Sequence, residues 1–404
     1  MFIRIPDFWV LTLFFLQLVS VNGIKLILEL NTGETFSNFV SKYDQFLGST
    51  KLKTQNIGFE TISIGQFKAI KGDFGINLLK SAYFDKNIKS ITFDRRLELL
   101  QVQSFAPKHL ARLSQRQKLK GFQEFEYVYD SAAAIGVDIY IFDTGIYRDH
   151  PDFSGRVRKG GNFVINDASG ESKLLQDPNG HGTAVAGVIG SETFGIAKKA
   201  NLIDYKVVNK KGYTHVSTIL KALNSAVLEI EETKRPSVIV LALGMSQKTH
   251  LLNHAIEAVV ERGIAVVTGA GNSNQNACEL TPASVNGVLT VGAIDINDSD
   301  HISEFSNWGA CVDIFASGVD VPTLASDAHP NAEKSVVLKS GTSMSAGIAA
   351  GLVSYFMGMN DTATEAIKRT KMYGTNGAIP QNDFLFRPFT PNKVLFNCGG
   401  DPLW

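Results

Sequence analysis

The larger part of the chain alternates short apolar strands with helices, and this pattern constrains the fold more than any other feature. Runs rich in β-branched residues and bounded by Gly, Asp or Asn predict strands at Val137–Phe142, Leu202–Val208, Val238–Leu243, Ile264–Thr268 and Val288–Val291. Helices are predicted between and after them, at Gly182–Gly190, Val216–Glu232, Leu251–Glu261 and Ala346–Met357. Continuous apolar strands that alternate with helices indicate an α/β domain, with a mainly parallel, doubly wound sheet and helices on both faces.

Residues 24–103 have a different order of predicted strands and helices, which predicts a small α+β domain before the larger one. Strand-like runs alternate with a predicted helix and an amphipathic stretch, in the order Ile24–Leu30, Thr35–Phe46, Phe59–Ile64, Phe74–Phe84 and Ile88–Phe93. This order, β-α-β-α-β, is typical of a compact two-layer unit.

The N-terminus has the features of a signal peptide at residues 1–23. Arg4 precedes an apolar run from Phe8 to Val21, and the small residue Gly23 follows it. The run is too short to span a bilayer comfortably, so we expect entry into the secretory pathway and no stable membrane anchor. The extracellular space, a cell or spore wall and the vacuole all fit a signal peptide without a retention tail.

Charge and cysteine content exclude some classes of protein. Lys plus Arg and Asp plus Glu both number 39, so no global field favours nucleic acid as a partner. The three cysteines allow at most one intramolecular disulfide, which excludes a disulfide-stapled scaffold. Sequons that begin at Asn297 and Asn360 predict N-glycosylation.

Reactive side chains follow the predicted strands or begin the predicted helices. Asp143 directly follows the first strand, and Asn272 follows the strand Ile264–Thr268. His181 and Ser343 lie in Gly-rich strings just before or at a helix start. Because ligands of doubly wound folds bind outside the carboxyl ends of the strands, we expect these four side chains to meet there.

These residue types suit nucleophilic catalysis by serine. A serine hydroxyl is a poor nucleophile near neutral pH, so an imidazole such as that of His181 must remove its proton. A carboxylate such as that of Asp143 fixes the imidazole tautomer and stabilises the imidazolium. The Asn272 amide and the Ser343 N–H are candidate donors to the oxyanion. The sequence therefore predicts a triad of Asp143, His181 and Ser343.

The strings and their order resemble the subtilisin family, and within it the proteinase K branch found in fungi. The resemblance rests on Asp143-Thr144-Gly145-Ile146, His150-Pro151-Asp152-Phe153, Gly180-His181-Gly182-Thr183, Gly269-Ala270-Gly271-Asn272, Phe305-Ser306-Asn307-Trp308-Gly309 and Ser340-Gly341-Thr342-Ser343-Met344. It implies a peptidase domain at residues 104–404 that acts as a serine endopeptidase on protein or peptide substrates. A monomer is expected, and the chemistry requires no cofactor.

The resemblance also assigns roles outside the triad. Residues 24–103 would be a prodomain that assists folding, occupies the cleft as an intramolecular inhibitor and is removed autocatalytically. Peptide substrates would pair by β-augmentation with two cleft segments. The residues of these segments are Gly212, Tyr213 and Thr214 in one, and Ala242, Leu243, Gly244 and Met245 in the other.

Two further sites follow from the resemblance. Cys278 and Cys311 fall in loops that are neighbours in the family fold, so a disulfide between them is a candidate, which would leave Cys398 unpaired. Asp313, with the main-chain carbonyls of Asn286 and Val288, matches a calcium site of proteinase K relatives.

The chain departs from the family pattern at four positions near the cleft. Ala184 replaces a common His, Thr214 and Met245 replace Gly, and Gly347 replaces Pro. These changes predict altered specificity, and Gly347 should loosen the turn behind Ser343. They also motivate an alternative, a catalytically weak or inactive subtilisin-fold protein that acts as a cell-wall or spore-wall component.

Overall fold

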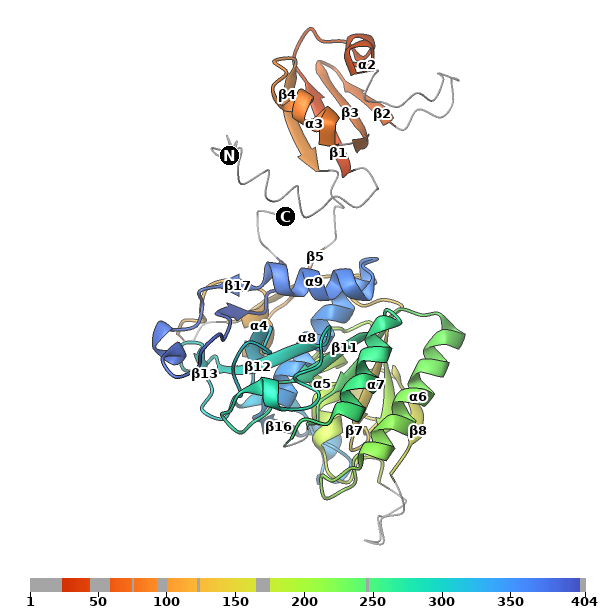
Figure 1. The fold of residues 1–404 in the computed structure, drawn as a ribbon, viewed down its shortest axis with the longest axis vertical. Coiled ribbons are helices and arrows are strands. Elements are labelled where there is room, and N and C mark those ends of the chain that lie inside the picture. Colours follow the sequence, from red (N-terminus) through yellow and green to blue (C-terminus); the bar gives the residue numbers. More distant parts are fainter. Residues whose placement is uncertain are drawn as a thin grey trace. The chain divides into compact units, whose positions relative to one another are not determined.

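The computed structural model of the 404-residue chain describes residues 24–43, 59–74, 76–93, 100–121, 124–164, 175–244 and 247–399. The chain divides into two compact units, Met1–Leu97 and Glu98–Trp404 (Figure 1). The predicted signal peptide at residues 1–23 lies outside the described residues. Within the described ranges, no helix is both long enough and apolar enough to cross a membrane.

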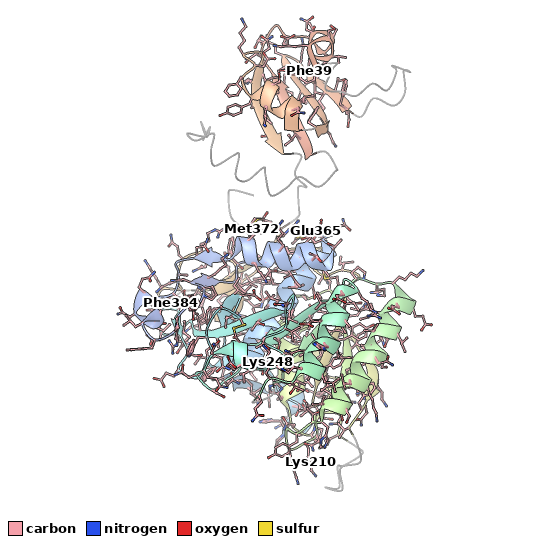
Figure 2. All side chains as sticks on the ribbon, viewed as in Figure 1. Phe39, Lys210, Lys248, Glu365, Met372 and Phe384 are labelled. Carbon is pink, nitrogen blue, oxygen red and sulfur yellow. A yellow bond between two sulfur atoms is a disulfide. The ribbon has the colours of Figure 1, made fainter. Side chains whose placement is uncertain are left out.

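In its described residues, the first unit is a four-stranded antiparallel sheet with the strand order β2-β3-β1-β4 and two helices. Its elements are β1 (Ile24–Leu30), α2 (Phe36–Tyr43), β2 (Phe59–Ile64), β3 (Phe67–Phe74), α3 (Ile76–Tyr83) and β4 (Ile88–Phe93). Alternate residues of β1, Leu26, Leu28 and Leu30, are buried in a core with Phe39 of α2 and Leu78 of α3 (Figure 2 labels Phe39). The predicted α+β unit is therefore present.

Strand β3 is missing from the sequence prediction, and its composition explains why. It reads Phe-Lys-Ala-Ile-Lys-Gly-Asp-Phe, which contains Gly72 and Asp73, and neither residue favours a strand. It forms because Gly65 turns the chain directly back after β2, with φ of 58°, and β3 then pairs along both β2 and β1. Cross-strand pairing thus overrides a weak local preference.

The second unit is built around a ten-stranded, mainly parallel sheet, which confirms the predicted fold class. Its strands are β7 (Asp138–Asp143), β8 (Val157–Asn162), β9 (Asn201–Lys206), β10 (Ser237–Leu241), β11 (Ala265–Gly269), β12 (Leu289–Asp295), β13 (His301–Ile302), β14 (Ile314–Ser317), β17 (Thr375–Asn376) and β18 (Lys393–Val394). Two separate ladders join β5 (Leu100–Gln103) to β6 (Tyr127–Asp130) and β15 (Val321–Leu324) to β16 (Val336–Lys339). The α-helices are α4 (Lys108–Leu113), α5 (His181–Gly190), α6 (Val216–Thr233), α7 (His250–Glu261), α8 (Thr342–Gly358) and α9 (Ala363–Tyr373).

Alternate residues of the central strands enter two separate hydrophobic cores. On β7, Ile139 and Ile141 pack in the core that contains α5 and α8, whereas Tyr140 and Phe142 pack in the core that contains α6 and α7. Figure 1 shows α6 and α7 side by side. Because side chains of a strand point alternately to its two faces, helices cover both faces of the sheet. This explains why all residues of β7 are buried.

Strand β7 lies where the strand order of the sheet reverses. It pairs in parallel with β9 on one side and with β10 on the other, and the chain continues beyond β10 to β11 and β12. In doubly wound sheets the crevice outside the carboxyl ends at such a reversal is the usual ligand site. Asp143 is the last residue of β7 and therefore lies at this crevice.

The two compact units divide after Leu97, whereas the sequence prediction ends the prodomain at residue 103. Residues Leu100–Gln103 form β5, which pairs antiparallel with Tyr127–Asp130 of the second unit. Strand β5, which the sequence prediction places in the prodomain, therefore pairs with a strand of the second unit. Long-range ladder pairing of this kind leaves no signal in the local sequence.

Leu241 tests the two-core packing of the sheet. Leu241 on β10 is completely buried, and Leu228 on α6 is 58% exposed. We expect Leu241→Ala to lower the free energy of unfolding by about 3 kcal/mol, because the lost methyl groups leave a cavity. Leu228→Ala should change it by less than about 0.5 kcal/mol. Denaturant unfolding, measured in a Ser343→Ala background to prevent self-digestion, checks both values, and equal effects would contradict this packing.

Candidate active site

Asp143 ends β7 with a carboxylate that is almost completely buried, its side chain being 3% exposed. It accepts a hydrogen bond from the Thr144 N–H at 2.7 Å. The His181 ring is its other partner, with Nδ1 2.7 Å from Oδ1 and 2.9 Å from Oδ2. A carboxylate only accepts hydrogen bonds, so Nδ1 carries the proton and Nε2 is left as the basic nitrogen.

His181 is the first residue of α5, and its ring is part exposed. The preceding residue, Gly180, is the N-cap and has φ of 88°, a conformation that favours glycine. Burial disfavours the imidazolium, but the charge and hydrogen bond of Asp143, with the charge of Asp177, outweigh it and raise the pKa of His181 above its usual value. The ring is therefore a stronger proton acceptor than a free imidazole.

Ser343 is the second residue of α8, which Gly341 precedes as N-cap with φ of 148°. The Ser343 hydroxyl donates to the Ala242 carbonyl at 3.1 Å, and Ala242 directly follows β10. Of the described residues, Ala242 is its hydrogen-bond partner, so the hydroxyl is not bonded to His181 in this state. Catalytic hydrogen bonds are often long without substrate and shorten in the complex.

Helices α5 and α8 cross closely about one turn beyond His181 and Ser343. A Cβ added to Gly347 would lie 2.7 Å from Cγ2 of Val188 and 3.4 Å from the carbonyl oxygen of Val185. Gly347 lies one turn after Ser343, and Val185 lies one turn after His181. The glycine that replaces the family's proline thus has a packing role, because a larger side chain would overlap Val188.

Asn272 follows β11, and its amide is held in one orientation. Its Oδ1 accepts two hydrogen bonds from Thr342, one from the N–H and one from the hydroxyl, both at 2.9 Å. The Thr342 hydroxyl in turn accepts from the Gly271 N–H at 3.1 Å. Because both donors engage the oxygen, the Asn272 NH₂ points away from Thr342 and lies beside Gly341. The Asn272 NH₂ group is thus available as a donor beside Gly341, which precedes Ser343 by two residues in the chain.

One of the predicted substrate segments, residues 212–214, lies on the loop between β9 and α6, where Figure 2 labels Lys210. The Asn209 side chain accepts from the Tyr213 N–H at 3.0 Å and shapes the loop. The Asn179 amide donates to the Lys210 carbonyl at 2.9 Å, which ties this loop to the one that precedes His181. The Tyr213 side chain is 70% exposed, so it is free to contact a ligand.

The other predicted segment begins at Ala242, the acceptor of the Ser343 hydroxyl. Leu243 and Gly244 follow it without regular secondary structure. Met245, one of the four departures from the family pattern, lies outside the described residues. Ala242 thus places this segment beside Ser343.

Comparison with known proteins identifies the family. The model described as Subtilase family, peptidase S8, matches residues 134–387. The chain belongs to the subtilase family.

Curated relatives and a solved structure agree with this assignment. The subtilase-type proteinase RRT12 of Saccharomyces cerevisiae is 36% identical, over 86% of this chain and 71% of that protein. Cerevisin of the same yeast is 32% identical, over 90% of this chain and 59% of cerevisin. The crystal structure of a cold adapted subtilisin-like serine proteinase matches with a TM-score of 0.62 and 30% identity, covering 72% of this chain and 98% of that one. The protein is therefore a subtilisin-like serine protease.

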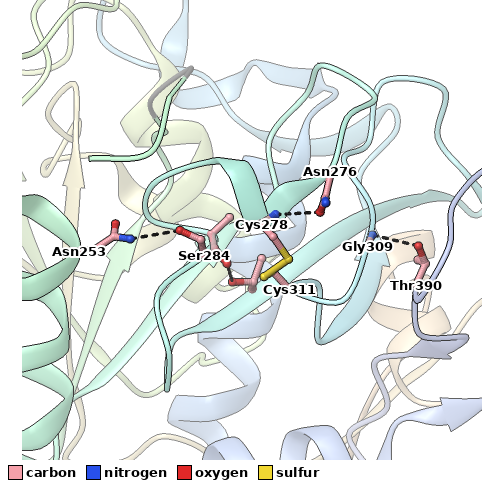
Figure 3. The surroundings of a disulfide bond; sticks show 9 residues. Asn253, Asn276, Cys278, Ser284, Gly309, Cys311 and Thr390 are labelled. Atoms are coloured by element: carbon pink, nitrogen blue, oxygen red, sulfur yellow. Dashed lines mark hydrogen bonds between the residues drawn. A yellow bond between two sulfur atoms is a disulfide. The ribbon is translucent and has the colours of Figure 1, made fainter. Parts of the chain in front are cut away.

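The subtilase carries the disulfide that the family resemblance implied. Cys278 and Cys311 are joined, with their Cα atoms 5.2 Å apart (Figure 3). Asn276 accepts from the Cys278 N–H at 3.0 Å and shapes the turn that presents this cysteine. Cys398 is buried and does not take part in this disulfide.

Asn307 holds the loop that carries Asn272, close in sequence to the disulfide. It is completely buried, and its Oδ1 accepts from the N–H groups of Ser273 and Gln275, both at 3.0 Å. Its Nδ2 donates to the Ala270 carbonyl at 2.8 Å. The loop on both sides of Asn272 is therefore fixed by a single side chain.

Asp313, the carboxylate of the calcium site that the resemblance implied, pairs with an ammonium group in this structure. Its Oδ1 lies 2.6 Å from Nζ of Lys371 on α9, and its Oδ2 accepts from the Thr290 N–H at 2.9 Å. A calcium ion needs six or more oxygen ligands, whereas here an ammonium group engages the single carboxylate. Within the described residues, no group of three or more His, Cys, Asp or Glu side chains is placed to hold a metal.

Sequence reasoning assigned no role to two residues that support the site. Thr342 orients the Asn272 amide, and Asp177 accepts hydrogen bonds on both sides of His181. Asp177 stands in Asp-Pro-Asn-Gly-His, three residues before the N-cap Gly180, where the usual N-cap preference does not apply. Thr342 is the first residue of α8, and Ser or Thr at a helix start is common, so neither residue carries a distinctive local signal.

Thr342 tests how the Asn272 amide is oriented. We expect Thr342→Val to lower kcat by about 10-fold with little change in KM, because the amide loses one of its two donors and binds the oxyanion less well. Thr342→Ser keeps the hydroxyl and should retain near-normal kcat, whereas Asn272→Leu should cost about 10²–10³ in kcat. Steady-state kinetics on one peptide substrate decide this, and equal kcat for the Val and Ser variants would contradict it.

Substitutions of Asp313 and Lys371 test which cation pairs with the Asp313 carboxylate. We expect the shift in Tm between calcium and chelator to be the same for Asp313→Asn as for the parent, because the carboxylate pairs with Lys371. Lys371→Met should lower stability by less than about 1 kcal/mol, since the pair is part exposed. A calcium response that Asp313→Asn abolishes would show that calcium displaces the ammonium.

Proposed function

We propose that this subtilase is a secreted endopeptidase that is made as a precursor and removes its own first unit. The observation that carries the proposal is the buried Asp143 carboxylate 2.7 Å from Nδ1 of His181, with Nε2 left free as a base. The inactive wall-component alternative has no comparable support, because no departure from the family pattern removes this pair, Ser343 or Asn272.

In the proposed mechanism the Ser343 hydroxyl attacks the carbonyl carbon of the scissile peptide bond. Nε2 of His181 takes the hydroxyl proton during attack and later gives it to the leaving amine. Asp143 keeps Nδ1 protonated and stabilises the imidazolium that forms. For attack, the Ser343 hydroxyl must leave the Ala242 carbonyl and turn to His181.

The negative charge that develops on the carbonyl oxygen needs fixed donors. We assign this role to the Asn272 NH₂ and the Ser343 N–H at the N-terminus of α8. The two hydrogen bonds from Thr342 support the assignment, because they prevent the amide from turning its oxygen towards the substrate. No cofactor is required for these steps.

Protein and peptide backbones are the proposed substrates. An extended peptide would add as a strand to residues 212–214 and to residues 242–245, with side-chain pockets adding preference. The exposed Tyr213 and the tie between Asn179 and the Lys210 carbonyl support a preformed binding edge close to His181. We expect the protein to act as a monomer.

The first unit is the proposed intramolecular inhibitor, and the secretory pathway is the proposed route. The disulfide supports this route, because such bonds persist in oxidising compartments. Asn297 and Asn360 are exposed in the turns after β12 and α8, so both are open to glycosylation. The extracellular space, a cell or spore wall and the vacuole remain the proposed destinations.

Self-processing is tested by expressing the whole precursor beside Ser343→Ala and Asp143→Asn. We expect the parent to shorten by about the mass of residues 24–97, the first unit without the signal peptide, and to react with an active-site serine reagent. Ser343→Ala should stay full length and unlabelled, and Asp143→Asn should process about 10⁴-fold more slowly. Mature parent enzyme added to Ser343→Ala controls for access to the cleavage site. Equal processing of parent and Ser343→Ala in isolation would contradict the proposal.

A further inference from the structure

Asp143 and His181 come from elements that are separate in the sequence, so something must hold the end of β7 in register with the start of α5. The backbone alone brings the segments into contact: a Cβ added to Gly182 would lie 2.1 Å from the Gly145 carbonyl oxygen. Contact without directional bonds, however, would not fix the ring of His181 within the tolerance that catalysis needs.

The carboxylate of Asp177 supplies directional bonds to the helix start. Its Oδ1 accepts from the Gly180 N–H at 2.9 Å and the Asn179 N–H at 3.3 Å. Its Oδ2 accepts from the Thr183 N–H at 2.9 Å and the Thr183 hydroxyl at 2.6 Å. These bonds fix the backbone on both sides of His181.

The same carboxylate is bonded to the residue that follows Asp143. The Thr144 hydroxyl donates to Asp177 Oδ1 at 2.7 Å and accepts from the Gly182 N–H at 2.9 Å. Thr144, Asp177 and the first turn of α5 thus form a closed ring of hydrogen bonds next to Asp143 and His181 in the chain. Asp177 is completely buried, so water does not compete for these bonds.

We propose that Asp177 is a positioning residue that fixes His181 against Asp143 by joining Thr144 to the first turn of α5. The inference rests on the proposed roles of Asp143 and His181. Backbone N–H groups or hydroxyls of Thr144, Asn179, Gly180 and Thr183 donate to the two Asp177 oxygens. Asparagine would turn one NH₂ towards other donors and leave at least one bond unmade.

The charge of Asp177 adds an electrostatic effect that a purely structural residue would lack. Asp143 and Asp177 favour the imidazolium of His181, whereas Lys339 on β16 opposes it. Around Asp177 itself, the Asp327 carboxylate accepts a hydrogen bond from the Asp177 N–H at 3.0 Å. Burial raises the pKa of Asp204 on β9, and the negative charge of Asp177 adds to this effect. Lys206, also on β9, donates to the Thr144 carbonyl at 2.6 Å.

The test compares Asp177→Asn with Asp138→Asn. Asp138 is also a buried carboxylate, but it lies at the opposite end of β7, where it accepts from Asn201 and Arg235. For Asp177→Asn we expect kcat to fall by about 10- to 100-fold with KM nearly unchanged. The acid limb of its pH profile should move to lower pH, because losing the negative charge makes the imidazolium harder to form. Asp138→Asn should leave both kcat and the acid limb as in the parent.

Variants of Thr144 keep the proposal testable if Asp177→Asn does not fold. Thr144→Val breaks the link without changing charge, so kcat should fall while the acid limb stays in place. Thr144→Ser retains the hydroxyl and should restore kcat. The inference is overturned if Asp177→Asn changes kcat and the acid limb no more than Asp138→Asn does, or if Thr144→Val is as active as Thr144→Ser. A parent enzyme that neither processes itself nor reacts with a serine reagent would instead overturn the proposed function.

Discussion

The burial of the Asp143 carboxylate is the constraint on which the rest of the active site depends. A charge removed from water is costly unless it is paired and hydrogen-bonded. Thr144 supplies one donor, and the imidazole of His181 supplies the other. The position of β7 at the reversal of the strand order explains how the carboxylate becomes buried, since β9 and β10 flank it and helices cover both faces. The pairing that satisfies Asp143 also leaves Nε2 of His181 as the basic nitrogen of the ring.

The active site also requires pairs of backbone segments to approach each other closely, and a glycine permits this approach at two places. Gly182 lets the start of α5 approach the Gly145 carbonyl after β7, and Gly347 lets α8 cross α5 against Val188. A helix glycine such as Gly347 has an intrinsic cost of about 1 kcal/mol relative to alanine. The close packing of α5 and α8 offsets that cost, so a substitution that looked like a weakness in the sequence has a clear structural reason.

Buried polar side chains then convert close approach into fixed geometry. Asp177 joins the end of β7 to the start of α5, Thr342 orients the Asn272 amide, and Asn307 holds the loop around Asn272. Each of these side chains bonds mainly to backbone N–H groups or to hydroxyls. Such bonds set the direction of the reactive groups, which apolar packing alone does not do. This arrangement is what preorganised electrostatic stabilisation of an oxyanion requires.

The sequence by itself determined most of the element types and the fold class, and it predicted the four reactive residues. These features depend on local periodicity, on strand ends and on short strings, all of which can be read from neighbouring residues. It did not reveal strand β3, which forms by pairing with β2 and β1, or the place of β5 in the second unit. The hydrogen bond from Ser343 to Ala242, the ring through Asp177 and the ammonium of Lys371 at Asp313 were decided only by the tertiary structure. The reason is physical: each joins groups that are far apart in the chain, and no local pattern records which distant partner the folded sheet and helices bring within hydrogen-bond distance.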